Sequence, residues 1–576
     1  NTKDGLHFGE VMIMLYKDGY KRTEYAKDIK GYTYIKDDKG IKRIPLGIDL
    51  VYDENINEYY NAKKFAMPSV RENSIIEYTY TVITPFLFNL PDWEFQRSIP
   101  TLYSSYQVSL IPFYEYSFRF QGATRFDYQN REVSGGIPRR VGSIEFQDVI
   151  HTYVMKNVPS FTDESFITTR EDYIMKIDFQ LAKINRTSGG SEEIMTTWEN
   201  LNETYLKDDD FGKYMKQAGK YAREVIEKIP PGENKVERIV EYIRTYYSWD
   251  GVFRRKTLLK AKEFAESRTG NSAEINLFLC AALNEAGVKA SPVLLSTRNH
   301  GKIHSNYPFE DQFNSVIVLA ETPDGLILTD GTEEYLPYNT IPPLCINGQG
   351  LIVNKDEGKF VNLTGYTNSM TSLNLSLTPN PDDGTIEGGV LLQSQGYEAY
   401  RIKRRLDNDL EEYKENAEKY GITGISDFES STKEGNKLTM RYNGHGELEQ
   451  LGENIIISPF LDWPESENPL KAQVRKYPVD MTYSSRHIFN SQIKIPDGYQ
   501  LEDIPTAYSV DDNLVKLVYN CKILGEHIVT YGEVLFKKSV YSNREYAKLR
   551  AHYIRMVELF NQELILTKIK SIIAEK

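Results

Sequence analysis

The residues of this sequence best suited to covalent chemistry lie where a polar segment meets a strongly apolar one. The segment Gly270-Asn271-Ser272-Ala273-Glu274 is followed directly by the apolar run 275–283. The positive end of a helix dipole could stabilise a thiolate at such a place, but a serine hydroxyl needs a neighbouring base to become a nucleophile. Whether the chain supplies a base for Ser272 therefore decides whether this segment can be an active site.

The same residues also fit a purely structural role. Asn or Ser at the start of a helix accepts hydrogen bonds from exposed backbone N–H groups, and Asn271 with Glu274 three residues later has the form of a capping box. We expect a helix that begins at Asn271 or Ser272 and ends at Ala286-Gly287, where glycine suits the left-handed backbone past a helix end. On this interpretation Ser272 helps to start a helix and does no chemistry.

A helix followed by strands must position these residues. Between 192 and 287 apolar residues recur at helical spacing, as at positions 236, 239, 240 and 243. Three strand-like runs follow at 291–295, 314–319 and 325–330, and the loop between the first two holds His300 and His304. The pattern predicts one helix that contains Ser272, followed in the sequence by strands that contain Ser315 and Asp330.

The regions on either side of this module have the pattern of β-structure. Up to about residue 185, short alternating runs broken by prolines predict a β-sandwich, and alternation returns after 363. Within the second β-region we expect a solvated, charged surface helix over 396–420 and a terminal amphipathic helix over 546–564 that packs on its own domain. The sequence thus predicts an α+β multidomain protein, divided into 1–185, 186–358 and 359–576.

Composition excludes several classes of function. The 576 residues include 69 Lys and Arg against 82 Asp and Glu, and the net charge of -13 argues against a nucleic-acid partner. Three distant cysteines exclude a disulfide framework and a cysteine-based zinc site, and Cys280 is expected to be a buried apolar residue. No run approaches the roughly 20 apolar residues of a membrane-spanning helix. Neither a cofactor motif nor a metal motif is found, so we predict no cofactor and no metal site, and the sequence predicts no oligomeric state.

The order of these motifs resembles the transglutaminase-like superfamily. The resemblance is closest to bacterial, Bacteroidetes-type three-domain proteins that have uncharacterised β-domains before and after a transglutaminase-like core. It rests on Phe65-Ala66-Met67-Pro68, Tyr247-Ser248-Trp249-Asp250-Gly251, the Gly270 segment, Phe313-Asn314-Ser315 and Asp330-Gly331-Thr332. The resemblance covers nearly the whole chain and implies a papain-like core. It also implies export to the periplasm or cell surface after removal of a signal peptide, and a first residue other than methionine agrees with this.

The resemblance also assigns the three catalytic positions of the family. The family's cysteine falls on Ser272, its histidine on Ser315 and its aspartate on Asp330, so only the aspartate is retained. In the enzymes the cysteine attacks an amide carbonyl, the histidine transfers the proton and the aspartate orients the imidazole. Ser315 cannot act as a base near neutral pH, and loss of a nucleophile or base typically costs about four to six orders of magnitude in turnover.

The resulting hypothesis is a catalytically inactive protein whose core binds or scaffolds a peptide or protein in the cell envelope. One alternative is an active transglutaminase-like or cysteine-protease-like enzyme in which serine replaces the nucleophile, but this would not explain Ser315. A serine enzyme that uses His300 or His304 from the loop is a second alternative. The third is an envelope structural protein without a ligand in the cleft, which a cleft filled by its own side chains would favour.

Overall fold

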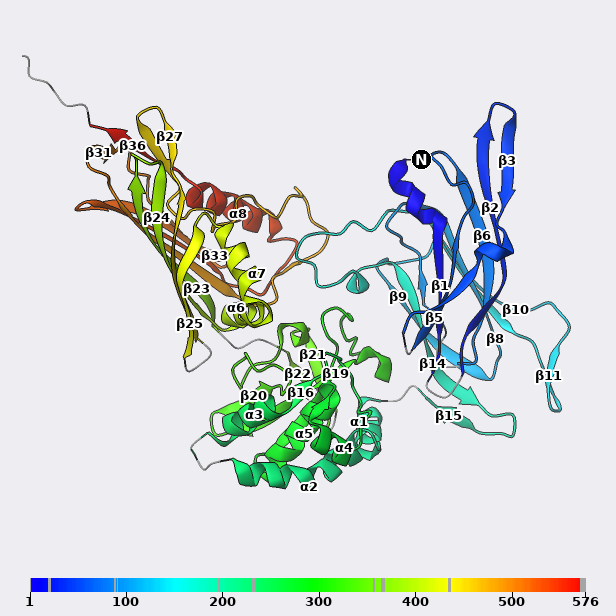
Figure 1. Ribbon diagram of the computed structural model, residues 1–576. Helices are drawn as coiled ribbons and strands as arrows, with labels where there is room; N and C mark the ends of the chain where they lie inside the picture. Colours follow the sequence, from blue (N-terminus) through cyan, green and yellow to red (C-terminus); the bar gives the residue numbers. More distant parts are fainter. Residues whose placement is uncertain are drawn as a thin grey trace, which may run out of the picture. The chain divides into compact units, whose positions relative to one another are not determined.

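The computed structural model describes residues 2–18, 22–57, 59–86, 90, 92–194, 197–229, 232, 234–355, 358–363, 368–433 and 437–569. The chain forms two compact units (Figure 1). The first unit comprises 1–95, 102–156 and 175–195, and the second comprises 96–101, 157–174 and 196–576. The protein is therefore multidomain and α+β, as predicted, whereas the division at 185/186 and 358/359 stays a prediction.

The first unit is built from antiparallel strands, as its alternating pattern predicted. Its sheets have the orders β1-β5-β4, β3-β2-β6, β10-β13-β8, β11-β12 and β15-β14-β7, and β9 also pairs with β14. One of its core clusters includes Leu15, Phe65 and Met67. The strands in this part of the chain are β1 Glu10–Tyr16, β2 Tyr25–Asp37, β3 Gly40–Pro45, β4 Tyr52–Asn55, β5 Tyr60–Ala66, β6 Ile75–Ile83, β7 Trp93–Glu94, β8 Thr101–Leu110, β9 Tyr114–Gln121, β10 Tyr128–Val133, β11 Arg139–Val141, β12 Ile144–Phe146, β13 Val149–Val158, β14 Lys176–Asn185 and β15 Ser191–Glu193.

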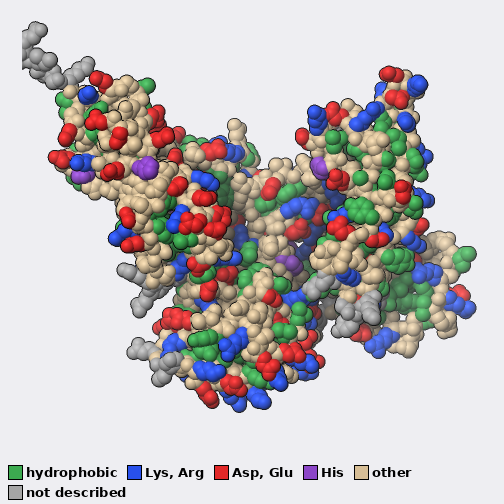
Figure 2. Space-filling model, viewed as in Figure 1, with side chains coloured by type: hydrophobic (Ala, Val, Ile, Leu, Met, Phe, Trp, Pro, Cys, Tyr) green, Lys and Arg blue, Asp and Glu red, His purple; other side chains and the backbone are tan. Residues whose placement is uncertain are grey.

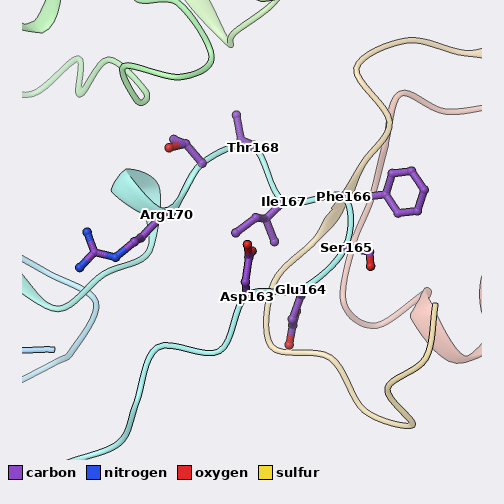
Figure 3. A pocket seen from close by; sticks show the side chains of 8 residues that line it. Asp163, Glu164, Ser165, Phe166, Ile167, Thr168 and Arg170 are labelled. Carbon is purple, nitrogen blue, oxygen red and sulfur yellow. The ribbon is translucent and has the colours of Figure 1, made fainter. Parts of the chain in front are cut away.

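The segment Asn157–Ile174 interrupts the first unit in sequence but packs within the second. Glu164 accepts hydrogen bonds from the backbone N–H groups of Lys476 and Tyr477. The Thr168 hydroxyl donates to the carboxylate of Asp480 over 3.0 Å. A cavity of about 550 Å³ is lined by Asp163 to Arg170 of this segment (Figure 3). We call Asn157–Ile174 the strap, because it ties an early part of the chain to residues about 300 positions later.

The middle of the chain places helices before a sheet, in the predicted order. The sheet has the order β20-β19-β18-β21-β22, and a separate parallel pair is formed by β16 and β17. Helix α5 packs against α2, α3, β18 and β19, and every residue from Ser272 to Leu283 is buried. The elements are α1 Trp198–Lys207, α2 Gly212–Lys228, α3 Lys235–Tyr246, β16 Ser248–Trp249, α4 Ala261–Ser267, β17 Thr269–Gly270, α5 Ser272–Glu285, β18 Ala290–Leu295, β19 Ser315–Thr322, β20 Gly325–Thr329, β21 Gln349–Ile352 and β22 Phe360–Asn362.

The last part of the chain is dominated by an eight-stranded sheet of order β25-β26-β24-β23-β30-β34-β33-β32. All neighbours are antiparallel except β23 and β30. Smaller sheets have the orders β27-β28-β36-β31 and β29-β35. The elements are β23 Ser369–Asn380, β24 Thr385–Gln395, α6 Tyr397–Asn408, α7 Leu410–Glu418, β25 Thr423–Lys433, β26 Lys437–Glu447, β27 Glu449–Leu451, β28 Asn454–Ile457, β29 Val479–Asp480, β30 Ser485–Lys494, β31 Tyr499–Leu501, β32 Tyr508–Asp511, β33 Val515–Leu524, β34 His527–Phe536, β35 Val540–Tyr541, α8 Tyr546–Phe560 and β36 Leu564–Lys568.

The prediction of one solvated helix over 396–420 was wrong. The stretch forms two helices, because the Asp409 side chain accepts a hydrogen bond from Glu412 N and starts α7 as its N-cap. One side of α6 is buried, and Tyr397 is fully covered while its hydroxyl donates to the carbonyl of Ile341. Because charged residues are so frequent in this stretch, the sequence did not indicate that one side of the helix is buried. The terminal prediction was correct from Tyr546 to Phe560, after which the chain turns into strand β36.

The surface mixes both signs of charge. Figure 2 shows acidic and basic side chains interspersed over the visible face, in keeping with the moderate net charge. No helix in the described part of the chain has both the length and the apolarity that crossing a membrane requires.

Candidate active site

The start of α5 is a capping box, as the sequence predicted. The side chain of Asn271 accepts hydrogen bonds from Ala273 N at 2.7 Å and Glu274 N at 3.3 Å. In return, the carboxylate of Glu274 accepts from Asn271 N at 2.7 Å. The helix ends where expected, with Gly287 in the left-handed conformation at φ +81°.

Glu274 has a second role that the sequence did not reveal. Its other carboxylate oxygen accepts hydrogen bonds from Leu258 N at 2.5 Å and Leu259 N at 3.0 Å. The side chain is 1% exposed, so these bonds form away from solvent. Glu274 therefore holds the loop before α4 against the start of α5, next to Ser272.

The Ser272 hydroxyl has a full set of hydrogen-bond partners. It donates to the carbonyl of Arg254 at 3.0 Å and accepts from the N–H of Arg254 at 2.9 Å. It also accepts from the hydroxyl of Ser315 at 3.2 Å. A hydroxyl offers one donor and two acceptor lone pairs, so nothing remains for a further partner. Both serines are 1% exposed, and the pair is closed to solvent.

Ser315 reaches Ser272 because of the strand on which it lies. It is the first residue of β19, paired with Leu295 of β18, and β19 packs directly on α5. The structure thus brings together the two serines that the resemblance placed at the nucleophile and base positions. Their assignment to those positions stays a prediction.

Asp330 takes part in a different network. Its carboxylate accepts from the Asn276 amide at 2.7 Å and from Thr332 N at 2.7 Å, and the latter bond is the predicted Asx-type turn. Asn276 also donates to Val316 O and accepts from Gly331 N, and it is 0% exposed. In the described chain no hydrogen bond joins Asp330 to either serine. Asn276 was missed, although a single amide in the apolar run 275–283 was a usable signal.

Arg244 holds the backbone of Asp330 and was also missed. Its guanidinium donates to the carbonyl of Asp330 at 2.9 and 2.6 Å and to the carbonyl of Leu336 at 2.5 Å. Burial lowers the pKa of Arg244 to about 10, against the opposing effect of the nearby carboxylates of Asp330 and Glu333. The side chain therefore remains charged at neutral pH and fixes the turn after β20.

The loop histidines have other partners. The ring of His300 lies 2.9 Å from the Ser296 hydroxyl, and the backbone N–H of His304 donates to the Gln312 side chain. Among the described residues, no imidazole hydrogen-bonds to Ser272. Cys280 is fully buried, as predicted, and burial raises the pKa of its thiol to about 12. Within the described ranges, no three His, Cys, Asp or Glu residues are grouped to hold a metal ion.

We expect Ser272→Ala to lower the free energy of unfolding of the second unit by about 1–3 kcal/mol, because both backbone groups of Arg254 lose a buried partner. Chemical denaturation monitored by tryptophan fluorescence measures this change. Ser509→Ala, at an exposed strand position, is the control and should change stability by less than about 0.5 kcal/mol. Equal stability of the two variants would contradict the importance assigned to the Ser272 bonds.

Comparison with known proteins shows similarity in the fold and in one segment of sequence. Residues 453–566 match a family described as a domain of unknown function with a solved structure, DUF3858. The solved structure of a putative protease from Parabacteroides distasonis has 12% identity and a TM-score of 0.58, over 98% of this chain and 93% of its own. A putative cysteine protease from Cytophaga hutchinsonii has 11% identity and a TM-score of 0.18 over 59% of this chain and 88% of its own. No curated protein matches the chain.

The similarity to the Parabacteroides protein shows a shared overall fold. At 12% identity it carries no information about activity or substrate. It agrees with the predicted likeness to Bacteroidetes proteins over nearly the whole chain. The three-domain arrangement and the papain-like form of the core stay predictions.

Proposed function

We propose that this protein is a catalytically inactive relative of the transglutaminase-like enzymes, and that its core acts as a binding or scaffolding module. The observation that supports the absence of catalysis is the closed hydroxyl pair of Ser272 and Ser315. The proton of Ser272 is donated to a backbone carbonyl, which is not a base at neutral pH. A substrate carbonyl must approach a nucleophile to about 3 Å, and a residue 1% exposed offers no such approach.

The burial of Ser272 also limits where a partner could bind. A peptide could not contact Ser272 or Asp330, because both are covered by their own chain. The loop over Ser272 is more accessible: the backbone carbonyl of Val252 accepts from Ser272 N, while the Val252 and Leu258 side chains are 44% and 65% exposed. We therefore assign the peptide or protein contact to this loop, with the serine pair as its support. The resemblance to exported Bacteroidetes proteins extends the proposal to the cell envelope.

The absence of catalysis can be tested with an activity probe. We expect a fluorophosphonate probe to label wild-type protein no more than Ser272→Ala, with an active serine hydrolase as the positive control. The reason is that fluorophosphonates react with serines activated by a base. Labelling of the wild type that disappears in Ser272→Ala would overturn the proposal.

The binding surface needs a separate test. Extract from the cell envelope would be passed over immobilised wild-type protein and over the double variant Val252→Asp, Leu258→Asp. We expect specific proteins to be retained by the wild type alone, since two charges would remove the apolar contact. Ile504→Asp, at another exposed apolar position, is the matched control. Equal retention by all three proteins would exclude this loop as the contact surface.

A further inference from the structure

A cavity of about 910 Å³ lies in the last part of the chain, between the eight-stranded sheet and helices α6, α7 and α8. Its size is in the range of small-molecule sites, about 300–1,000 Å³. All lining residues fall between Thr371 and Phe560, so the cavity shares none with the Ser272 site. An inference from it is independent of the function proposed above.

The cavity lies where the three helices leave the middle of the sheet uncovered. Helix α6 packs on β23 and β24, α7 packs on β25, and α8 packs on β33. Between them, the first six residues of β30 are all only half-buried, whereas β33 and β34 alternate with fully buried residues. Packing on one face of a mainly antiparallel sheet gives alternating burial, and the first six residues of β30 depart from this pattern. The gap over β30 is therefore a feature of how these helices are placed.

The floor and walls of the cavity are apolar. The register pairs Leu373 of β23 with Leu392 of β24 and with Phe489 of β30, so the three side chains form one row on the same face. Ile402 lines the cavity from α6, and Met556 lines it from α8. Methionine adapts its shape to irregular apolar ligands. These surfaces suit an aliphatic chain.

One polar group in the lining lacks a partner. The indole N–H of Trp463 is buried and has no hydrogen-bond partner among the described residues. The indole is held in place by stacking on Tyr420, with ring centroids 4.3 Å apart and planes at 14°. An unsatisfied buried donor is costly, so an acceptor atom supplied by a ligand would stabilise this site.

One arginine in the lining, Arg405, is available to bind a charged ligand. Arg401 forms an ion pair with Glu398 at 2.8 Å, and Lys419 donates to Asn416 at 2.7 Å. In the described part of the chain the Arg405 guanidinium has neither a hydrogen bond nor an ion pair, and its charge acts on Tyr413 of the lining. The carboxylates of Asp409, Glu412 and Glu465 also line the cavity, so a ligand with more than one negative group would be repelled.

We propose that this cavity binds a long-chain fatty acid. The aliphatic chain lies over the row of Leu373 and Phe489, and the single carboxylate accepts hydrogen bonds at the rim from Arg405. A guanidinium matches a carboxylate in geometry as well as in charge. The apolar row of Leu373, Leu392 and Phe489 favours a ligand whose larger part is aliphatic and which has one polar end.

The full-length protein can be tested by displacement of the fluorescent fatty acid cis-parinaric acid. Palmitic acid is the probe, and 1-hexadecanol is its uncharged counterpart of equal chain length. We expect saturable binding of palmitic acid, about tenfold weaker in Arg405→Ala, with hexadecanol unaffected by that substitution. Arg555→Ala, a partly exposed arginine on α8 outside the lining, is the matched control. Glu412→Gln should strengthen palmitic acid binding by removing a like charge.

A second variant distinguishes the contribution of the apolar cavity to binding from that of Arg405 at the rim. Ile402→Trp fills the space and should abolish binding of both palmitic acid and hexadecanol, with the circular dichroism spectrum checking that the fold is intact. Absence of saturable binding to the wild type would overturn the proposal. So would an affinity for palmitic acid that neither Arg405→Ala nor Ile402→Trp changes. Binding to phosphatidylglycerol vesicles without binding of free palmitic acid would also overturn it, in favour of a membrane lipid.

Discussion

Replacing Asn276 by aspartate should destabilise the second unit by about 3–5 kcal/mol at pH 8. The substitution removes the two N–H donors that serve Val316 O and the Asp330 carboxylate. It also places a second carboxylate 2.7 Å or so from the first, in a position that is 0% exposed. Unpaired buried polar groups and uncompensated buried charge are each among the most destabilising changes in proteins.

The loss of stability in Asn276→Asp should depend on pH in a defined direction. Two carboxylates in one dry site cannot both ionise, so one of them must have a pKa in the folded state above its unfolded value. The folded state then binds more protons than the unfolded state between these two pKa values, and stability falls as pH rises through that window. Denaturation midpoints at pH 5 and pH 8 measure the effect, and the variant should be closer to wild type at pH 5.

The double variant Asn276→Asp, Asp330→Asn is the matched control for this prediction. It restores one amide and one carboxylate to the site with their positions exchanged, so much of the lost stability should return. A coupling energy from the double-mutant cycle near zero would show that the two side chains act independently, contrary to the bond between them.

Glu274→Ala should have a comparable effect, lowering the free energy of unfolding by about 3–5 kcal/mol. The carboxylate accepts from three backbone N–H groups, those of Leu258, Leu259 and Asn271, and the side chain is 1% exposed. Each buried donor left unsatisfied costs about 1–3 kcal/mol. The capping box of α5 is lost at the same time.

Hydrogen exchange would localise the effect of Glu274→Ala. We expect faster exchange of the amides of Leu258, Leu259 and Asn271, with little change in the eight-stranded sheet. Glu241→Ala, at an exposed position of α3, is the control and should leave all of these amides unchanged. Unchanged protection of Leu258 and Leu259 in Glu274→Ala would show that the loop is held by other contacts.

The parts of the site that depend on local pattern were predictable. The capping residues Asn271 and Glu274 and the Asx-type turn at Asp330 each involve residues two or three apart, which their spacing reveals. The strands that come after α5 in the sequence were predicted from short apolar runs. The closeness of Ser272 and Ser315 was implied by the resemblance alone, which placed them at the family's nucleophile and base positions.

The parts that join distant segments could not be predicted from one sequence. The second role of Glu274 requires the loop at Leu258 to fold back on α5. The role of Asn276 requires residues that lie 40 and 54 positions further along the chain. Charge density over α6 suggested a solvated helix, because the pattern does not show that Tyr397 meets Ile341. In each case the missing information is a tertiary contact, which local propensity does not contain.

The strap cannot reach its final contacts until most of the polypeptide has been synthesised. Thr168 and its partner Asp480 are 312 residues apart in the chain. At typical elongation rates of about 5–20 residues per second, roughly 15 to 60 s pass between the emergence of the two. During that interval the strap has left the ribosome without its binding residues. We expect nascent chains arrested before residue 480 to be cut by proteases within 157–174, and chains released at full length to be protected there.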